Sequence, residues 1–241
     1  MKHMLSSALI AGLVTGLLCA LLQYLLVEPD ILLAERYETG ELTHFTAPAD
    51  QDHATAPADP AAEAGQDHPA SNVETSPLQR QALTVLFSVL TYCGFALVLL
   101  GGIRLAEASD ITLGPAQGLL WGLAGFLTFQ MMPALGLAPE LPGTPAVDLS
   151  ARQYWWAATA AATAIGLWFA AYGTALWQRL AGAGVLAAPQ LWGAPEPETF
   201  GGIVPPELAA AFAAHSLGVG LITWVVLGGV LVAFWHSEPA P

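Results

Sequence analysis

The sequence predicts an all-α, polytopic membrane protein with about six transmembrane helices. Apolar residues make up 55% of the chain and charged residues only 10%, whereas soluble chains carry about 25% charged residues. The charges are also clustered, so that five long stretches contain no Lys, Arg, Asp or Glu: 5–27, 81–103, 113–137, 154–178 and 208–235. About 20 apolar residues in a helix cross about 30 Å of hydrocarbon. Helices of a soluble bundle would carry a polar stripe, which these stretches lack, so we expect each to span a bilayer.

The first stretch, 5–27, follows Lys2 and could in principle be a cleaved signal sequence. Its apolar core exceeds the 7–15 residues of a signal, and no small-x-small cleavage site follows it. We therefore expect it to remain as the first span.

The loop after the first span is strongly acidic. Eleven of the 19 acidic residues lie between Glu28 and Glu74, and segment 43–76 is rich in Ala, Pro and Asp. Such a segment cannot bury enough apolar surface to offset its ordering entropy. It predicts a disordered external loop between a first unit, 1–42, and a membrane domain, 77–241. His44, His53 and His68 in or beside its Asp-rich repeats are open to two interpretations, a solvated linker or a weak capture loop for divalent metal.

An internal repeat predicts a sixth span. PALGLAPE at 133–140 and PQLWGAPE at 189–196 agree at five of eight positions, and an acid–Leu pair opens the next helix after each. The repeating unit, about 118–156 and 174–214, is a helix, a Pro-rich acidic loop and a helix, as in many transporters. It predicts a short span over 176–192 and six spans arranged as three helical hairpins. Five spans with a short interfacial helix is the alternative.

The connections predict the orientation. Lys2, Arg104 and Arg179 fall in short connections on one side, but Arg36, Arg80 and Arg152 lie on the other, so the count of positive charges is a tie. The pattern of loops decides the orientation and makes the side with the short connections cytoplasmic. The three long acidic loops then share the external side.

Small residues predict how the spans pack. Ala8, Gly12, Gly16 and Ala20 recur every four residues on one helix face, and Gly118 and Gly122 repeat the spacing in the third span. Such faces let helices approach closely in lipid.

Polar groups within the spans are few, namely Gln23, Gln130 and His215, with Glu28 at a helix end. Intramembrane ionisable groups are costly and tend to mark function. The repeat places structured acidic ends on the same side as His215, so the candidate metal ligands are Glu28, Glu140, Glu196 and His215. A histidine hydrogen-bonded between helices is an equally open interpretation of His215.

Several motifs together resemble the CbtA family, the predicted A subunit of a cobalt transporter. They are LLQYLLVEPDILLAERYE (21–38), GLLWGLAGF (118–126), ALGLAPELPG (134–143), DLSARQYWW (148–156) and GAPEPE (193–198). The resemblance implies a prokaryotic inner-membrane protein for Co²⁺ uptake, linked to cobalamin synthesis. It also implies a small single-span companion subunit of the CbtB kind.

No catalytic motif competes with transport. HExxH, GxSxG and the Walker A loop are all missing from the sequence, so we expect no enzyme activity, no cofactor and no nucleic-acid partner. Two alternatives stay open. One is a membrane receptor that concentrates divalent metal for another channel, and the other is a carrier subunit for a corrinoid precursor.

Overall fold

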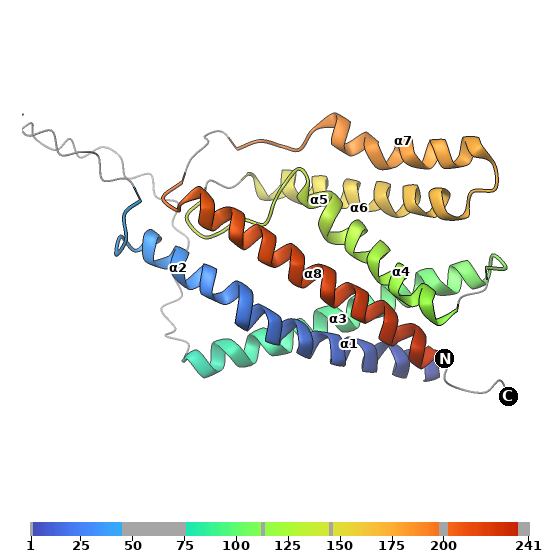
Figure 1. Cartoon of the computed structure of the whole chain (residues 1–241), viewed down its shortest axis with the longest axis horizontal. Helices are drawn as coiled ribbons and strands as arrows, with labels where there is room; N and C mark the ends of the chain where they lie inside the picture. Colours follow the sequence, from blue (N-terminus) through green and yellow to red (C-terminus); the bar gives the residue numbers. More distant parts are fainter. Residues whose placement is uncertain (1, 45–75, 112–113, 145–146, 198–201, 236–241) are drawn as a thin grey trace, which may run out of the picture.

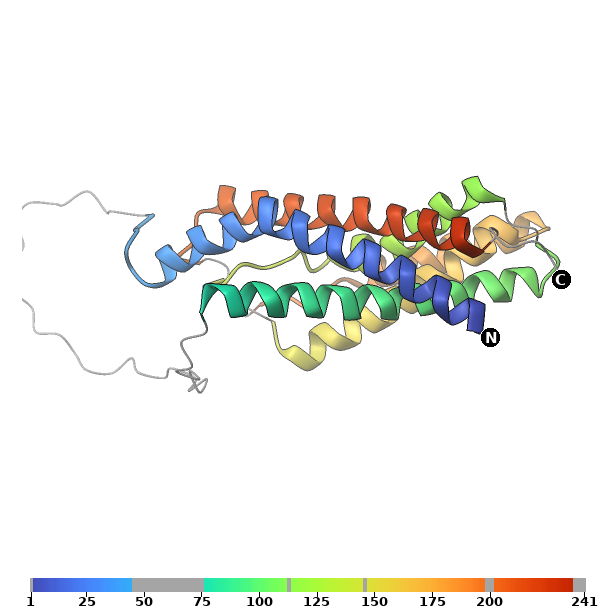
Figure 2. The same cartoon turned by 90° about the horizontal axis from the view of Figure 1, so that it is seen from below.

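The described part of the chain is entirely helical where it is regular (Figures 1 and 2). A computed structural model describes residues 2–44, 76–111, 114–144, 147–197 and 202–235. Its elements are α1 (Lys2–Leu22), the π-helical turn η1 (Gln23–Val27), α2 (Glu28–Glu38), α3 (Pro77–Glu107), α4 (Pro115–Phe126), the π-helical turn η2 (Leu127–Met131), α5 (Met132–Ala134), α6 (Leu149–Tyr172), α7 (Leu176–Trp192) and α8 (Pro206–Trp235). The all-α prediction is confirmed for these residues.

These elements join into six helical rods. α1, η1 and α2 form one continuous rod, α4, η2 and α5 form a second, and α3, α6, α7 and α8 stand alone. Three rods are long and apolar enough to cross a membrane, Leu5–Glu38, Leu78–Glu107 and Pro206–Phe234. The short helix expected at 176–192 is present as α7, with 17 residues. Most of the acidic loop predicted at 43–76 lies outside the described residues.

Side chains fix where several helices begin. Ser76 Oγ accepts a hydrogen bond from the backbone N–H of Gln79 at the start of α3, and Asp148 does the same for Ala151 at the start of α6. These bonds satisfy donors that have no partner within the helix. The Ser150 hydroxyl and then the Ala151 N–H also hold the pKa of the exposed Asp148 carboxyl below its usual value. Asp148 therefore remains ionised where α6 begins.

The rods pack in three main pairs, α1 with α3, α4 with α8, and α6 with α7, while α8 also contacts α1. The first pair is the predicted hairpin around the acidic loop. The other two predicted hairpins are wrong, because α4 pairs with α8 rather than α6, and α7 pairs with α6 across a short turn (Figure 1).

Small residues explain this choice of partners. A Cβ added at Gly118 would lie 2.6 Å from the carbonyl oxygen of Gly228 in α8, and one at Gly166 would lie 2.7 Å from that of Gly182. The structure likewise places Gly12 and Gly16 against α3, where an added Cβ would lie 2.5 Å from the Cα of Cys93 or Val89. A Cβ at Gly122 would meet the backbone of Trp224. Without a hydrophobic force between helices in lipid, such close backbone approach selects the partner.

The two ends of the bundle differ in their connections. The N-terminus, the last turn of α8, the α3–α4 connection and the α6–α7 turn lie at one end (Figure 1). The end of α2 and the starts of α3 and α8 lie at the other, with the α5–α6 and α7–α8 connections. Lys2, Arg104 and Arg179 thus share one end, and the long acidic connections share the opposite end.

The small-residue face of α1 yields a prediction. Gly12→Leu and Gly16→Leu should each destabilise the folded state by about 1–3 kcal/mol, the usual effect of overpacking, because rigid backbone of α3 lies where the side chain must go. Gel filtration of detergent-solubilised protein and its melting temperature measure this. Gly94→Leu is the matched control, since nothing lies within 4 Å of an added Cβ there, and Leu13→Ala alters an exposed apolar side chain. Normal yield for both glycine variants would show that this face of α1 makes no close contact.

Candidate functional site

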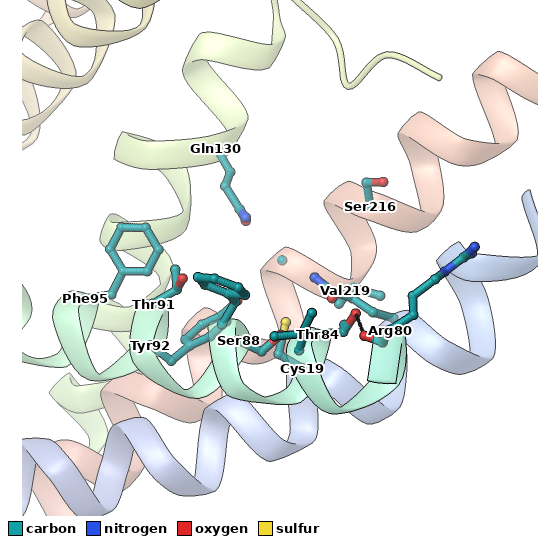
Figure 3. A pocket seen from close by; sticks show the side chains of 14 residues that line it. Cys19, Arg80, Thr84, Ser88, Thr91, Tyr92, Phe95, Gln130, Ser216 and Val219 are labelled. Carbon is teal, nitrogen blue, oxygen red and sulfur yellow. Dashed lines mark hydrogen bonds between the residues drawn. The ribbon is translucent and has the colours of Figure 1, made fainter. Parts of the chain in front are cut away.

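A polar cavity of about 580 Å³ lies among the first rod, α3, η2 and α8 (Figure 3). It is lined by Cys19, Gln23, Arg80, Leu83, Thr84, Phe87, Ser88, Thr91, Tyr92, Phe95, Gln130, Ser216, Val219 and Gly220. Because Arg80 lines the cavity and its side chain is 45% exposed, the cavity reaches the surface at the end that carries the acidic connections.

Both π-helical turns contribute a glutamine to this cavity. Gln23 opens η1 and Gln130 lies in η2, and each side chain lines the cavity. A π-turn inserts one extra residue into a helix and is found frequently at functional sites. Figure 3 shows Gln130 extending from η2 toward the side where Cys19 and Ser88 lie. Two of the three polar groups that the sequence places within the spans therefore meet in one space.

Gln130 is in an unusual environment. It packs against Gly220 of α8, where any Cβ would collide with the amide group. Its Oε1 atom is buried and has no hydrogen-bond partner among the described residues. A buried acceptor without a donor is unfavourable by about 1–3 kcal/mol, and a turn of this amide from Gly220 into the cavity would let it accept a hydrogen bond from a guest.

Hydroxyl groups of α3 line one wall of the cavity. Thr84, Ser88 and Thr91 recur at intervals of four and three residues, which places them on one helix face. Tyr92, on the same wall, shares a hydrogen bond with Thr223 of α8. This wall of the cavity therefore carries neutral oxygen groups, with the Cys19 thiol nearby, whereas Leu83, Phe87, Phe95 and Val219 make much of the remaining lining apolar.

Aromatic rings lie next to the cavity on the side away from Arg80. Phe95 lines the cavity, and its ring centroid is 4.7 Å from that of Trp224. Phe129 stacks on Trp224 with centroids 5.5 Å apart, and Trp224 is fully buried. These three rings, from α3, η2 and α8, separate the cavity from the end of the bundle where α8 finishes.

Charged groups surround the cavity's exposed edge. Arg80 lies 3.8 Å from a carboxylate oxygen of Glu28 and 3.8 Å from one of Glu35, both on α2. The guanidinium therefore bridges α3 to two successive turns of α2. Since the Arg80–Glu28 and Arg80–Glu35 distances are long and the side chains are partly exposed, each ion pair contributes little to stability. Their main effect is on the electrostatic potential at the edge of the cavity.

A second charged contact joins α2 to α8. His215 Nδ1 lies 2.7 Å from Asp30 Oδ2, and the Asp30 side chain is only 14% exposed. Ser216, the next residue of α8, lines the cavity. The imidazole–carboxylate pair thus joins α2 to α8 one residue before a cavity-lining position, although neither of its side chains lines the cavity.

The four sequence-predicted ligands do not meet. Glu28 contacts Arg80, Glu140 lies 3.3 Å from Arg152, and Glu196 is exposed in the connection after α7. Only His215 approaches a carboxylate, and that carboxylate is Asp30. Among the described residues no group of three or more His, Cys, Asp or Glu side chains could hold a metal ion.

The predicted metal-capture loop lies mostly outside the described residues. His44 is exposed just after α2, whereas His53 and His68 lie outside the described residues.

The geometry suits transient cation handling. One imidazole nitrogen and one carboxylate oxygen are ligands that borderline divalent metals accept, but two ligands leave most coordination positions to water. A site of this kind binds weakly and releases readily, as conduction requires.

Asp30 and Arg80 lie at the site but were not predicted from the sequence to belong to it. Asp30 stands two residues after Glu28, in the Glu-Pro-Asp run that opens α2. The sequence therefore shows an acidic residue there, but it does not show that its side chain faces α8. Arg80 lies one turn into α3, directly before the charge-free stretch that begins at residue 81. This position at the start of a span is the one feature of the sequence that could have identified it.

Comparison with known proteins identifies a family for this chain. The family model described as probable cobalt transporter subunit (CbtA) matches residues 1–236. No curated protein and no solved structure matches the chain.

Proposed function

This chain belongs to the CbtA family of probable cobalt transporter subunits, and we propose that it takes up Co²⁺ through the polar cavity. The observation that carries the proposal is that cavity, which is lined by glutamines from both π-turns and flanked by the Asp30–His215 pair. We propose six spans in a prokaryotic cytoplasmic membrane, a companion subunit with a single span of the CbtB kind, and a supply of cobalt for cobalamin synthesis.

The acidic end of the bundle is the proposed external side. Eleven of the chain's 19 acidic residues lie between Glu28 and Glu74, and a cleft with one sign of charge raises the local concentration of counter-ions. Lys2, Arg104 and Arg179 lie at the opposite end, and Arg36, Arg80 and Arg152 at the acidic end, so the short connections rather than the count of positive charges make the opposite end cytoplasmic in this proposal. Glu28, Glu140 and Glu196 act in this proposal as parts of the acidic field.

Capture and relay are separate steps in the proposal. His44, His53 and His68 bind metal weakly and raise its concentration near the cavity, as a tethered weak binder does. Asp30 and His215 then receive the ion at the cavity's edge, where they are held by α2 and α8. In this proposal the fixed ligands on α2 and α8 control the maximal rate of uptake, whereas the histidine loop controls the metal concentration near the cavity.

Reporter fusions test the orientation. Fusions at Ala108 and Thr174 should report a cytoplasmic location, and fusions at Thr144 and Gly202 an external one. These sites lie in connections at opposite ends of the bundle (Figure 1). An external location for Thr174, or opposite locations for Thr144 and Gly202, would contradict the six-span arrangement.

The relay pair has a kinetic signature. Asp30→Asn and His215→Ala should each lower the maximal rate of radiolabelled Co²⁺ uptake by roughly tenfold, at least as much as loss of an outer-shell partner does at a metal site. Extra cobalt should not restore the rate, because the missing ligand is on the route itself. Glu38→Gln, an exposed acid on the same helix, is the control. Full rescue of both relay variants by excess cobalt would remove the pair from the route.

The capture loop should act only on supply. Deleting 46–68, which removes His53 and His68, should reduce uptake when cobalt is scarce and leave it near normal when cobalt is plentiful. Uptake measured over a range of cobalt concentrations checks this. Loss of uptake at every concentration would assign the loop an essential role in transport.

One comparison separates the transporter from its alternatives. Vesicles containing this chain, with and without its companion, should accumulate radiolabelled Co²⁺. Binding without accumulation in either case would favour the metal receptor. A growth defect of a deletion strain that supplied cobalamin relieves and extra cobalt leaves unchanged would favour the corrinoid carrier.

A further inference from the structure

The ligand chemistry of the cavity differs from that of a tight divalent-metal site. Among the described residues its lining contains no carboxylate and no imidazole, and the one charged residue there is the cationic Arg80, which faces Glu28 and Glu35. Divalent cations in proteins are normally held by several carboxylate, imidazole or thiolate ligands. Here a bare ion would meet amides, hydroxyls and one thiol. The lining therefore fits poorly to an ion that has lost its water.

The size of the cavity points the same way. Six coordinated waters occupy about 180 Å³ at roughly 30 Å³ for each water, and the cavity volume is about 580 Å³. An ion that keeps its complete first shell of water fits inside with room to spare. Small divalent ions give up that shell reluctantly, so retaining it avoids a desolvation penalty that the neutral lining could not offset.

The polar groups that line the cavity can accept hydrogen bonds from the waters of a hydrated ion. Gln23 and Gln130 come from η1 and η2, and the α3 hydroxyls and Ser216 of α8 also line the cavity, together with apolar side chains such as Leu83 and Phe87. Waters bound to a cation direct their hydrogens outward and donate strongly. Gln130 Oε1 lies against Gly220 without a hydrogen-bond partner among the described residues, and a turn of this side chain into the cavity would present it to such donors.

We propose that the cavity takes the divalent cation as its hydrated ion, recognised through hydrogen bonds from the coordinated waters to Gln23, Gln130 and the α3 hydroxyls. Direct coordination by protein atoms is then confined to the Asp30–His215 pair at the cavity's edge. This inference rests on the proposed function and names the form in which that function's substrate is handled.

Hexaamminecobalt(III) tests the inference. It resembles a hexahydrated ion in size and shape, presents N–H donors on its surface, and does not exchange its ligands, so no protein atom can coordinate the metal. It should compete with radiolabelled Co²⁺ for uptake into cells that produce the full chain and its companion. Gln130→Leu should require roughly tenfold more of the complex for the same inhibition, as expected for one hydrogen bond to a charged ligand.

Two controls keep the result interpretable. Gln79→Leu removes an exposed amide near Arg80 that does not line the cavity, and it should leave inhibition unchanged. Gln23→Leu, checked for folding by gel filtration, repeats the cavity test should Gln130→Leu fail to fold.

The possible outcomes distinguish a failure of the hydrated-ion inference from a failure of the proposed transport function. Normal Co²⁺ uptake that a large excess of the complex does not slow overturns the hydrated-ion inference and leaves the transport function standing. Equal inhibition of the wild-type chain and both cavity variants also overturns it, because the complex would then act at the acidic surface. Absence of Co²⁺ uptake without any inhibitor overturns the proposed function, and with it the inference.

Discussion

The close contact between α4 and α8 determines the rest of the arrangement. Gly118 and Gly122 meet Gly228 and Trp224 with no room for a side chain between the backbones. Because η2 continues directly from α4, this contact sets the position of Gln130 opposite α8 and brings Phe129 onto Trp224. In lipid, where helices have no hydrophobic drive to associate, such contacts decide which helices surround a polar space. The cavity is thus a consequence of glycine placement outside it.

The two π-turns give that space its polarity. Each adds a residue to a helix turn and rotates everything beyond it relative to the helix before. In the first rod, Gln23 faces the cavity at η1, and beyond it Glu28 faces Arg80 of α3 while Asp30 faces His215 of α8. A neutral cavity and a charged edge therefore follow one another along a single rod. In the proposed route, this order would let an ion exchange direct ligands at the edge for hydrogen bonds within the cavity.

Particular residues show how far the sequence could predict this structure. The charge-free stretches predicted the helices, because the bilayer enforces length and apolarity on each one separately. The small-residue faces at Gly12 and Gly118 were visible for the same local reason, but their partners were not, since no periodicity within α4 identifies α8. Asp30 was not predicted as a site residue, because an unbroken α-helix and a helix with a π-turn have the same sequence pattern and point this acid in different directions. Glu140 and Glu196 occupy equivalent repeat positions, yet one pairs with Arg152 and the other is exposed.

The central claim is that the metal occupies the cavity between the two π-turns. Anomalous scattering at the cobalt edge, from crystals of this protein grown with Co²⁺, locates the ion directly. The account predicts a peak inside the cavity, between Gln23 and Gln130 and beyond direct bonding distance of both, with a second peak at Asp30 and His215. Peaks confined to surface carboxylates such as Glu140 and Glu196, with none in the cavity, would contradict it.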